Sequence, residues 1–261
     1  MDLQLEGKKA LVTGSTAGIG LAIATALARE GADVVINGRT DARVAEAMHK
    51  IREHARGSVS GVAADSGTRA GADRLIAQVP AVDVLVNNLG IFEPKSFADI
   101  PDEDWLRFFE VNVLSGVRLA RAYLPGMLQR NFGRIVFISS ESAFQIPAEM
   151  IHYGMTKSAQ VAVARGLAET TTGTGVTVNS VLPGPTRSEG VEAFVQKLSG
   201  GTSFADFERE FFTSVRPTSL LKRFETVEEV ASVVAFVCSP LAAAINGAAV
   251  RAEGGVLKSA F

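Results

Sequence analysis

Short runs of apolar residues alternate along the chain with longer segments in which apolar residues recur at the spacing of an α-helix. Several runs are apolar at consecutive rather than alternate positions, which is typical of parallel strands covered on both faces. We expect strands at 8–13, 33–37, 58–64, 82–87, 133–139, 175–182 and 247–253. We expect helices at 18–30, 41–54, 67–79, 103–130, 153–171 and 226–238.

This alternation predicts an α/β fold with one Rossmann-like doubly wound domain over residues 1–261. In such a domain a parallel sheet, here of about seven strands, carries helices on both faces. The rhythm lapses only over 184–225, where short amphipathic pieces replace it. Because long irregular segments in compact domains are usually functional, we expect these residues to form a lid over a substrate.

Composition and charge narrow the possible partners. Hydrophobic residues make up 47% of the chain, and the formal net charge is −2. A balanced charge without long runs of one sign argues against nucleic acid or a membrane as a partner. The amino-terminal segment lacks the apolar stretch of a signal peptide, the apolar run at 230–238 is too short to span a bilayer, and the single Cys238 cannot form an intrachain disulfide. We therefore expect a cytoplasmic protein.

A glycine-rich turn, TGSTAGIG at 13–20, connects the first expected strand to the first expected helix. Gly14 permits a tight turn, Gly18 lets backbone amides approach a diphosphate, and Gly20 lets the helix pack closely on the sheet. Such glycines can also do no more than close a strand–helix turn, but a strand before and a helix after favour dinucleotide binding. The predicted contacts are Gly14, Ser15, Thr16, Gly18, Ile19 and Gly20.

Three further motifs follow in order: NNLG at 87–90, ISS at 138–140, and a tyrosine and a lysine four positions apart at 153 and 157. Together with the GxxxGxG spacing of the turn, this set resembles the short-chain dehydrogenase/reductase family over essentially the whole chain. The resemblance implies an oxidoreductase that transfers a hydride between a nicotinamide cofactor and a carbonyl or secondary alcohol carbon.

The candidate catalytic residues are Ser140, Tyr153, Lys157 and Asn112. Residues four apart share one face of a helix, so we expect the Lys157 ammonium to lower the pKa of Tyr153 toward neutrality. Ser140 would polarise the substrate carbonyl, whereas Ser139 should point to the other face. The resemblance implies that Lys157 also binds the nicotinamide ribose and that Asn112 holds a water of a proton relay. Taken singly, Ser140 could instead be a turn hydroxyl and Asn112 a helix irregularity. Tyr153 and Lys157 could be a surface pair.

The end of the second strand bears on the choice of cofactor. An acidic residue there would bind the ribose hydroxyls of NAD, but the chain has Asn37 and Gly38, followed by Arg39. Arg39 can pair with a 2′-phosphate, so we expect NADP(H) to be preferred, with NAD(H) possible. The alternative is that Arg39 is a solvated loop charge.

Further cofactor contacts follow from the resemblance alone. Asp65 would hold the adenine amino group, although it could equally be the N-cap of the next helix. Leu89 departs from the alanine usual in relatives. The remaining implied contacts are Asn88, Gly90, Tyr153, Lys157, Pro183, Gly184 and Thr186.

The substrate and the assembly are less constrained. The lid segment is rich in phenylalanine, which indicates either an apolar substrate or rings that fix short helices to the core; these residues are Phe194, Phe204, Phe207, Phe211, Phe212 and Phe224. The leading hypothesis is a carbonyl reductase or alcohol dehydrogenase. The alternatives are a 3-oxoacyl reductase of lipid synthesis and a non-catalytic dinucleotide-binding sensor. The three histidines indicate no metal site, and the resemblance implies a homotetramer or homodimer.

Overall fold

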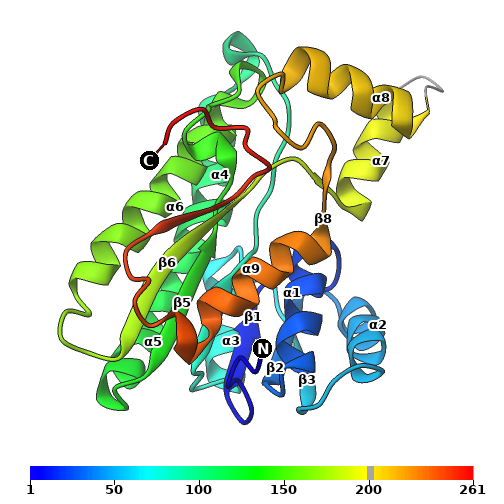
Figure 1. Cartoon of the computed structure of the whole chain (residues 1–261). Coiled ribbons are helices and arrows are strands. Elements are labelled where there is room, and N and C mark those ends of the chain that lie inside the picture. Colours follow the sequence, from blue (N-terminus) through cyan, green and yellow to red (C-terminus); the bar gives the residue numbers. More distant parts are fainter. Residues whose placement is uncertain (199–202, 261) are drawn as a thin grey trace.

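The computed structural model describes residues 1–198 and 203–260. Its centre is a parallel sheet in which seven strands follow the order β3-β2-β1-β4-β5-β6-β9 (Figure 1). The strands are β1 (Lys9–Val12), β2 (Asp33–Gly38), β3 (Val59–Ala63), β4 (Val84–Asn87), β5 (Gly133–Ile138), β6 (Val176–Pro183) and β9 (Ala249–Ala252). This arrangement confirms the doubly wound α/β fold expected from the sequence.

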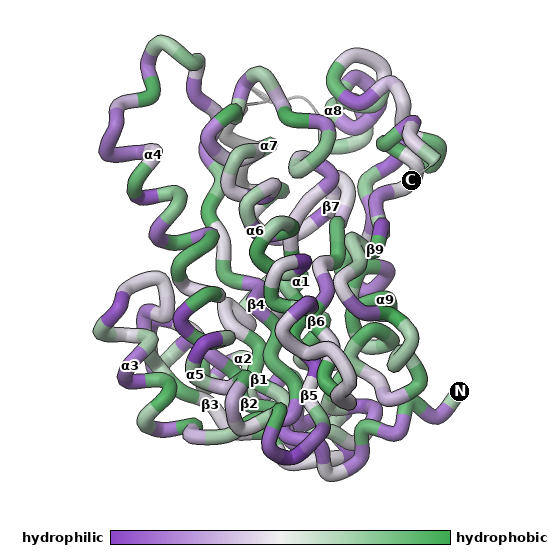
Figure 2. Tube along the Cα trace, turned by 90° about the vertical axis from the view of Figure 1, so that its left-hand side faces the viewer, coloured by the Kyte–Doolittle hydropathy of each residue, from purple (hydrophilic) through white to green (hydrophobic). Residues whose placement is uncertain are grey.

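Helices cover both faces of the sheet. On one face α1, α2 and α9 pack on residues such as Ala10 and Val12, and on the other α3, α5 and α6 pack on residues such as Leu11. The helices are α1 (Gly18–Arg29), α2 (Asp41–Arg52), α3 (Arg69–Gln78), α4 (Asp102–Phe109), α5 (Ser115–Gln129), α6 (Ile151–Glu169), α7 (Glu189–Leu198), α8 (Phe204–Glu210) and α9 (Val227–Cys238). Figure 2 shows hydrophobic residues along the inner strands, which explains their consecutive apolar positions.

The strand order reverses between β1 and β4. The chain runs outward from β1 to β2 and β3, and then returns to place β4 on the other side of β1. In open parallel sheets ligands bind outside the carboxyl ends of the strands at such a point. The sequence motifs at 13–20 and 87–90 both follow these two strands.

Two expectations about helices need correction. The helix expected at 103–130 is divided into α4, a π-helical turn η2 (Glu110–Leu114) and α5. The N-cap of α3 is Thr68, whose hydroxyl accepts a hydrogen bond from the Gly71 N–H at 3.0 Å. Asp65 therefore does not cap this helix; its carboxylate instead accepts from the Gly67 N–H at 3.1 Å within the preceding turn.

The segment expected as a lid contains α7, α8 and a π-helical turn η5 (Phe211–Val215), which lie beyond one end of the main sheet (Figure 1). Two short strands that the sequence did not predict, β7 (Thr186–Arg187) and β8 (Glu225–Thr226), pair in parallel at the two ends of this segment. The remaining short elements are the 3-10 turns η1 (Phe97–Asp99), η3 (Glu141–Ala143), η4 (Ala148–Met150) and η6 (Pro240–Ala242). No helix among the described residues is long and apolar enough to cross a membrane.

The packing of α4 on α6 encloses a histidine. His152 is fully buried, with its ring centroid 4.0 Å from that of Phe108 and 6.0 Å from that of Trp105. Neither ring nitrogen of His152 has a hydrogen-bond partner among the described residues. Burial lowers the pKa of His152, although Asp104 and Glu93 nearby act in the opposite direction.

Replacing Gly116 by alanine should destabilise the fold, because its new Cβ would lie 2.6 Å from Phe137 Cε1 and 3.1 Å from Asn87 Cγ. We expect the free energy of unfolding to fall by about 1–2 kcal/mol, measured by urea denaturation. Gly166 provides the matched control, since it is also helical and a Cβ there would meet nothing within 4 Å. Gly166→Ala should raise stability by about 0.5–1 kcal/mol. Equal effects of the two substitutions would contradict the packing described.

Acid should destabilise the protein through His152. Because its pKa in the folded chain lies below the ordinary 6.5, the unfolded chain binds more protons below that pH. The free energy of unfolding should therefore fall as the pH drops below about 6.5, by up to about 1.4 kcal/mol per pH unit. His152→Leu should remove this part of the loss between about pH 7 and about pH 5.5 in urea denaturation. The control, His54→Leu at an exposed position, should leave the loss in place.

Candidate active site

The glycine turn has the backbone geometry that its sequence indicates. Gly14 and Gly18 adopt positive φ angles of 60° and 55°, which favour glycine. A Cβ on Gly20 would lie 2.4 Å from Asn88 Nδ2 and 2.5 Å from the Gly14 carbonyl oxygen, so only glycine fits there. No side chain caps the first turn of α1, which leaves its N–H groups available to an anion. The turn therefore fits the diphosphate of a dinucleotide.

A clasp between Thr13 and Asn88 holds this turn to the end of β4. The side-chain amide of Asn88 donates to the carbonyl oxygens of Thr13 (2.9 Å) and Gly14 (3.1 Å). In return, the Thr13 hydroxyl accepts from the backbone N–H groups of Asn88 and Leu89, each at 3.0 Å. The side-chain nitrogen of Asn88 thus shapes the turn. A contact of Asn88 with the cofactor stays a prediction. Sequence analysis missed Thr13, although it opens the glycine motif.

The other polar residues of the turn also bind protein groups. The Ser15 hydroxyl donates to the Val12 carbonyl at 2.7 Å and accepts from the Asn37 N–H at 3.0 Å. Thr16 lies beside Gly38, where a Cβ would be 2.4 Å from Thr16 Cγ2. Ser15 therefore ties the turn to β2, and Thr16 packs against the end of that strand.

The end of β2 presents no acidic side chain. Asn37 is buried: its amide donates to the carbonyls of Val62 (3.2 Å) and Ala64 (3.0 Å), and its oxygen accepts from Ser66 Oγ at 2.8 Å. The side chain of Asn37 therefore bonds β3 and the turn that follows it. The next residues are Gly38 and the exposed Arg39.

Leu89 packs within the turn that follows β4. Its methyl groups lie 3.5 Å from the positions where Gly14 and Gly67 would carry a Cβ, and its N–H keeps the bond to Thr13. Leu89 therefore packs between two glycines at the switch point of the sheet. Asp65, two residues before Gly67, is exposed. Its proposed contact with the adenine amino group stays a prediction.

A cavity of about 290 Å³ brings most of the remaining candidates together at the carboxyl ends of the strands. The predicted residues that line it are Ile19, Asn88, Gly90, Ser140, Tyr153, Lys157, Pro183, Gly184 and Thr186. The predicted residues outside its wall are Gly14, Ser15, Thr16, Gly18, Gly20, Arg39, Asp65 and Asn112. Three of the four candidate catalytic residues, Ser140, Tyr153 and Lys157, therefore share one cavity with the loop after β6.

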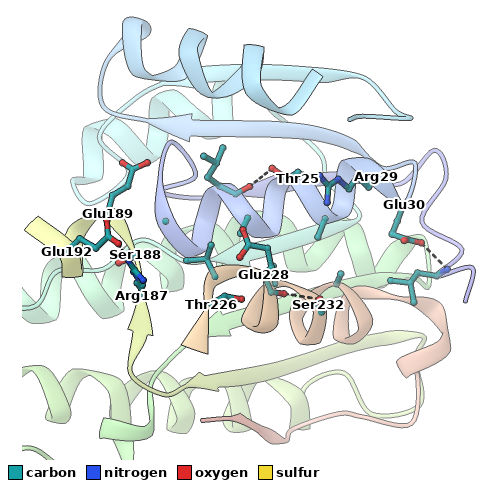
Figure 3. A pocket seen from close by; sticks show the side chains of 18 of the residues that line it. Thr25, Arg29, Glu30, Arg187, Ser188, Glu189, Glu192, Thr226, Glu228 and Ser232 are labelled. Carbon is teal, nitrogen blue, oxygen red and sulfur yellow. Dashed lines mark hydrogen bonds and ion pairs between the residues drawn. The ribbon is translucent and has the colours of Figure 1, made fainter. Parts of the chain in front are cut away.

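A second, larger hollow of about 870 Å³ lies between α1 and α9 (Figure 3). Apolar residues, among them several alanines, and charged side chains such as Arg187 and Glu228 line it. Gly18 is the one predicted site residue on its wall. The candidate catalytic residues do not line it.

Strand β5 and helix α6 position the catalytic candidates. The Lys157 ammonium donates to the Ile138 carbonyl at 2.9 Å and lies 5.5 Å from the centre of the Tyr153 ring. Ser139 Oγ donates to the Lys157 carbonyl at 2.9 Å, whereas Ser140 begins the η3 turn and accepts from the Ser142 N–H. The two serines thus have separate roles, and only Ser140 interacts with the Tyr153 side chain.

We expected Lys157 to lower the pKa of Tyr153, and this prediction is wrong when only the groups of the protein act on Tyr153. Burial raises the pKa of Tyr153 to about 12, and interaction with Ser140 opposes this rise only in part. Burial also lowers the pKa of Lys157 to about 7, so its charge is only partial near neutral pH. Helical spacing brings the two side chains together. The effect of the nearby ammonium on the pKa of Tyr153 is nevertheless smaller than the effect of lost solvation.

Asn112 uses its side chain to fix the chain that leaves β4. Its amide oxygen accepts from the Ile91 N–H at 2.8 Å, and its nitrogen donates to the Ile91 carbonyl and to Thr156 Oγ1, both at 3.0 Å. Its backbone carbonyl accepts from Gln160 at 2.6 Å. The π-helical turn places this residue between Gly90 and α6. Participation in a water relay stays a prediction.

The phenylalanines of the lid divide into two groups. Phe207, Phe211 and Phe224 line the cavity, whereas Phe204 and Phe212 pack against Phe224 from outside it. The side chain of the sixth candidate, at position 194, lies outside the described part of the chain. Ring packing is confirmed for Phe204 and Phe212, whereas an apolar substrate against the lining rings stays a prediction.

Three charged residues near the cavity were not among the predicted site residues. Glu141 and Arg216 form a buried ion pair in its wall, with Arg216 Nε 2.9 Å from Glu141 Oε1. Glu225 accepts from the Gly184 N–H at 3.2 Å, and burial raises its pKa to about 7. The position of Glu141 directly after Ser140 was the one available signal. Within residues 1–198 and 203–260, no cluster of His, Cys, Asp and Glu could hold a metal ion.

Known proteins resemble this chain over nearly its whole length. The family model described as short chain dehydrogenase matches residues 8–199. The chain is 50% identical to the uncharacterized oxidoreductase YvaG of Bacillus subtilis, with all of both chains covered. It is 32% identical to 3-oxoacyl-[acyl-carrier-protein] reductase FabG of Aquifex aeolicus, covering 98% of this chain and 100% of that one.

A solved structure agrees with this relationship. L-sorbose reductase from Gluconobacter frateurii, complexed with NADPH and L-sorbose, superimposes with a TM-score of 0.92 at 33% identity. The match covers 99% of this chain and 100% of that one. The resemblance noted in the sequence is confirmed, and the protein belongs to the short-chain dehydrogenase family of oxidoreductases.

Proposed function

We propose that the protein is an NADP-preferring carbonyl reductase or alcohol dehydrogenase. The observation that carries this proposal is the convergence of Ser140, Tyr153 and Lys157 with the loop after β6 on one cavity. A protein that only binds or senses a dinucleotide has no need of a tyrosine proton donor beside that loop. We also propose that the chain is one domain, with residues 184–225 as its lid, and that it acts in the cytoplasm.

The cofactor is a nicotinamide dinucleotide, in keeping with the family and with the NADPH of the L-sorbose reductase complex. The uncapped amino terminus of α1 and the turn at Gly14 and Gly18 would hold its diphosphate. Arg39 would pair with the 2′-phosphate, since no carboxylate at the end of β2 opposes it. Bound there, the cofactor supplies the hydride.

The protein supplies the proton and the orientation. With a pKa raised to about 12, Tyr153 keeps its proton at neutral pH, which suits donation to the alkoxide formed when a carbonyl is reduced. Ser140 interacts with Tyr153 and would hydrogen-bond the carbonyl oxygen, so that developing charge meets two donors. Lys157 is fixed by Ile138 beneath the ring, where it would bind the cofactor ribose.

The 3-oxoacyl reductase function is a second candidate, because FabG is among the relatives. The cavity of about 290 Å³ provides room for a small carbonyl compound. L-sorbose, the ligand of the similar reductase, is such a compound. We therefore place small carbonyl substrates first. A panel of small carbonyls and 3-oxoacyl thioesters, each assayed with NADPH and NADH, separates the two candidates.

Assembly follows from the same family relationship. We propose a homotetramer or homodimer in which α5, α6 and the edge strand β9 meet copies of themselves. Light scattering of the purified protein measures this directly.

Tyr153→Phe should abolish turnover while leaving cofactor binding intact, because it removes only the proton donor. We expect the rate of carbonyl reduction to fall at least about a thousandfold, and the dissociation constant of NADPH, from fluorescence titration, to change less than about threefold. Tyr123→Phe is the matched control. This buried tyrosine donates to the Val79 carbonyl at 2.8 Å away from the cavity and should matter for stability alone. Full activity of the Tyr153 variant would refute the assignment.

Arg39→Ala should reduce the preference for NADPH. Losing one charge-assisted bond to the 2′-phosphate is expected to lower kcat/KM with NADPH about tenfold to a hundredfold and to leave the value with NADH nearly constant. Arg29→Ala, at an exposed position at the far end of α1, should change neither. An unaltered NADPH to NADH ratio in the Arg39 variant would show that this side chain is a solvated charge.

A further inference from the structure

The wall of the cavity contains a buried ion pair next to the proposed catalytic serine. Glu141 and Arg216 are 3% and 6% exposed, and both line the cavity that contains Ser140 and Tyr153. Glu141 follows Ser140 directly, so their Cα atoms are about 3.8 Å apart. Arg216 comes from the end of the η5 turn in the lid. A charged pair in an otherwise largely apolar wall costs desolvation energy, which calls for an explanation.

The pair is incompletely satisfied. Glu141 Oε1 accepts from Arg216 Nε at 2.9 Å, but Glu141 Oε2 is buried without a hydrogen-bond partner among the described residues. Arg216 Nη1 donates to the Val215 carbonyl at 3.1 Å, and within the described chain no hydrogen bond involves Nη2. One acceptor and one donor therefore remain for a ligand. A buried unpaired carboxylate oxygen is costly, and a ligand that pairs with it gains affinity.

The charges around the pair disfavour an anion. The guanidinium of Arg216 faces two carboxylates, Glu141 at 2.9 Å and Glu149 at 3.9 Å. Its positive charge is thus neutralised within the protein, and no net cation is left at this end of the cavity for a substrate carboxylate. A hydroxyl group fits better, because it can donate to one partner and accept from the other.

From this geometry we infer that Glu141 and Arg216 determine specificity, selecting neutral carbonyl substrates that carry a hydroxyl group a few bonds from the reacting carbon. The inference rests on the proposed function, in which Ser140 and Tyr153 hold the carbonyl oxygen. The substrate hydroxyl donates to Glu141 Oε2 and accepts from Arg216 Nη2. Phe207, Phe211 and Phe224 cover the carbon skeleton from the lid side. A substrate that lacks the hydroxyl leaves both polar atoms unpaired.

Three ketones of similar size test the inference. They are 4-hydroxy-2-butanone, which has the hydroxyl; 2-pentanone, in which a methyl group replaces it; and acetoacetate, which has a carboxylate. With NADPH, we expect kcat/KM for the hydroxyketone to exceed that for 2-pentanone at least about tenfold, with acetoacetate lowest. A wild-type preference for acetoacetate or for 2-pentanone would overturn the inference and leave the reductase function standing.

Glu141→Gln tests the contribution of charge. The glutamine keeps an oxygen for Arg216 but removes the negative charge, so the guanidinium becomes available to a carboxylate. The ratio of kcat/KM for acetoacetate to that for the hydroxyketone should rise at least about tenfold. Glu192→Gln is the matched control, since this lid carboxylate pairs with Arg187 and does not line the cavity. An unchanged ratio in the Glu141 variant would overturn the inference.

Binding without turnover distinguishes the inference from the function. The Tyr153→Phe variant, saturated with NADPH, is melted in the presence of each ketone at the same concentration. We expect 4-hydroxy-2-butanone to raise the melting temperature most and acetoacetate least. If this order appears but the wild-type protein reduces none of the three, the reductase proposal fails, and only the assignment of Glu141 and Arg216 as a hydroxyl-binding pair stands. If the hydroxyketone gives no larger shift than 2-pentanone, the inference fails whatever the activity.

Discussion

The clasp between Thr13 and Asn88 is the interaction on which the site depends. Its bonds join the turns that follow β1 and β4, the two strands between which the order of the sheet reverses. By fixing the Thr13 and Gly14 carbonyls, Asn88 sets the direction in which α1 begins. Every proposed contact to the diphosphate then follows from the position of that helix. Polar side chains that satisfy backbone groups thus prepare a site that a ligand can enter without rearrangement.

Much of this architecture could be predicted from the sequence because it is locally encoded. The consecutive apolar runs predicted the seven parallel strands, and the glycines at 14, 18 and 20 predicted the turn that the backbone angles show. The four-residue spacing correctly placed Tyr153 and Lys157 on one cavity. These features depend on periodicity, steric exclusion or helical geometry, which neighbouring residues determine. The division of the helix at 103–130 was missed, because the bonds from Asn112 to Ile91 join distant parts of the chain.

Charge and burial could not be predicted in the same way. Arg216 and Glu141 are 75 positions apart, and nothing in either segment indicates that they meet. The pKa values of Tyr153 and Lys157 depend on how much water the folded chain removes, which spacing does not reveal. The same limit applies to Asn37: it stands where a cofactor contact was considered, yet its side chain is used within the sheet. The residue types in the sequence indicated which chemical groups were available, and the packing of the folded chain determined which groups they bond.

The small sheet of β7 and β8 has a consequence for how such a protein can change. Thr186 pairs with Glu225, so the two ends of the proposed lid are joined to each other beside the loop after β6. Glu225 also bonds Gly184, which keeps this loop in place from the carboxyl-terminal end of the lid. The described elements between these strands, α7, α8 and η5, therefore begin and end at one place. Evolution or protein engineering can therefore exchange the segment between these strands for one of different length or lining, and so alter which molecules are accepted, while Ser140, Tyr153 and Lys157 keep their positions outside it.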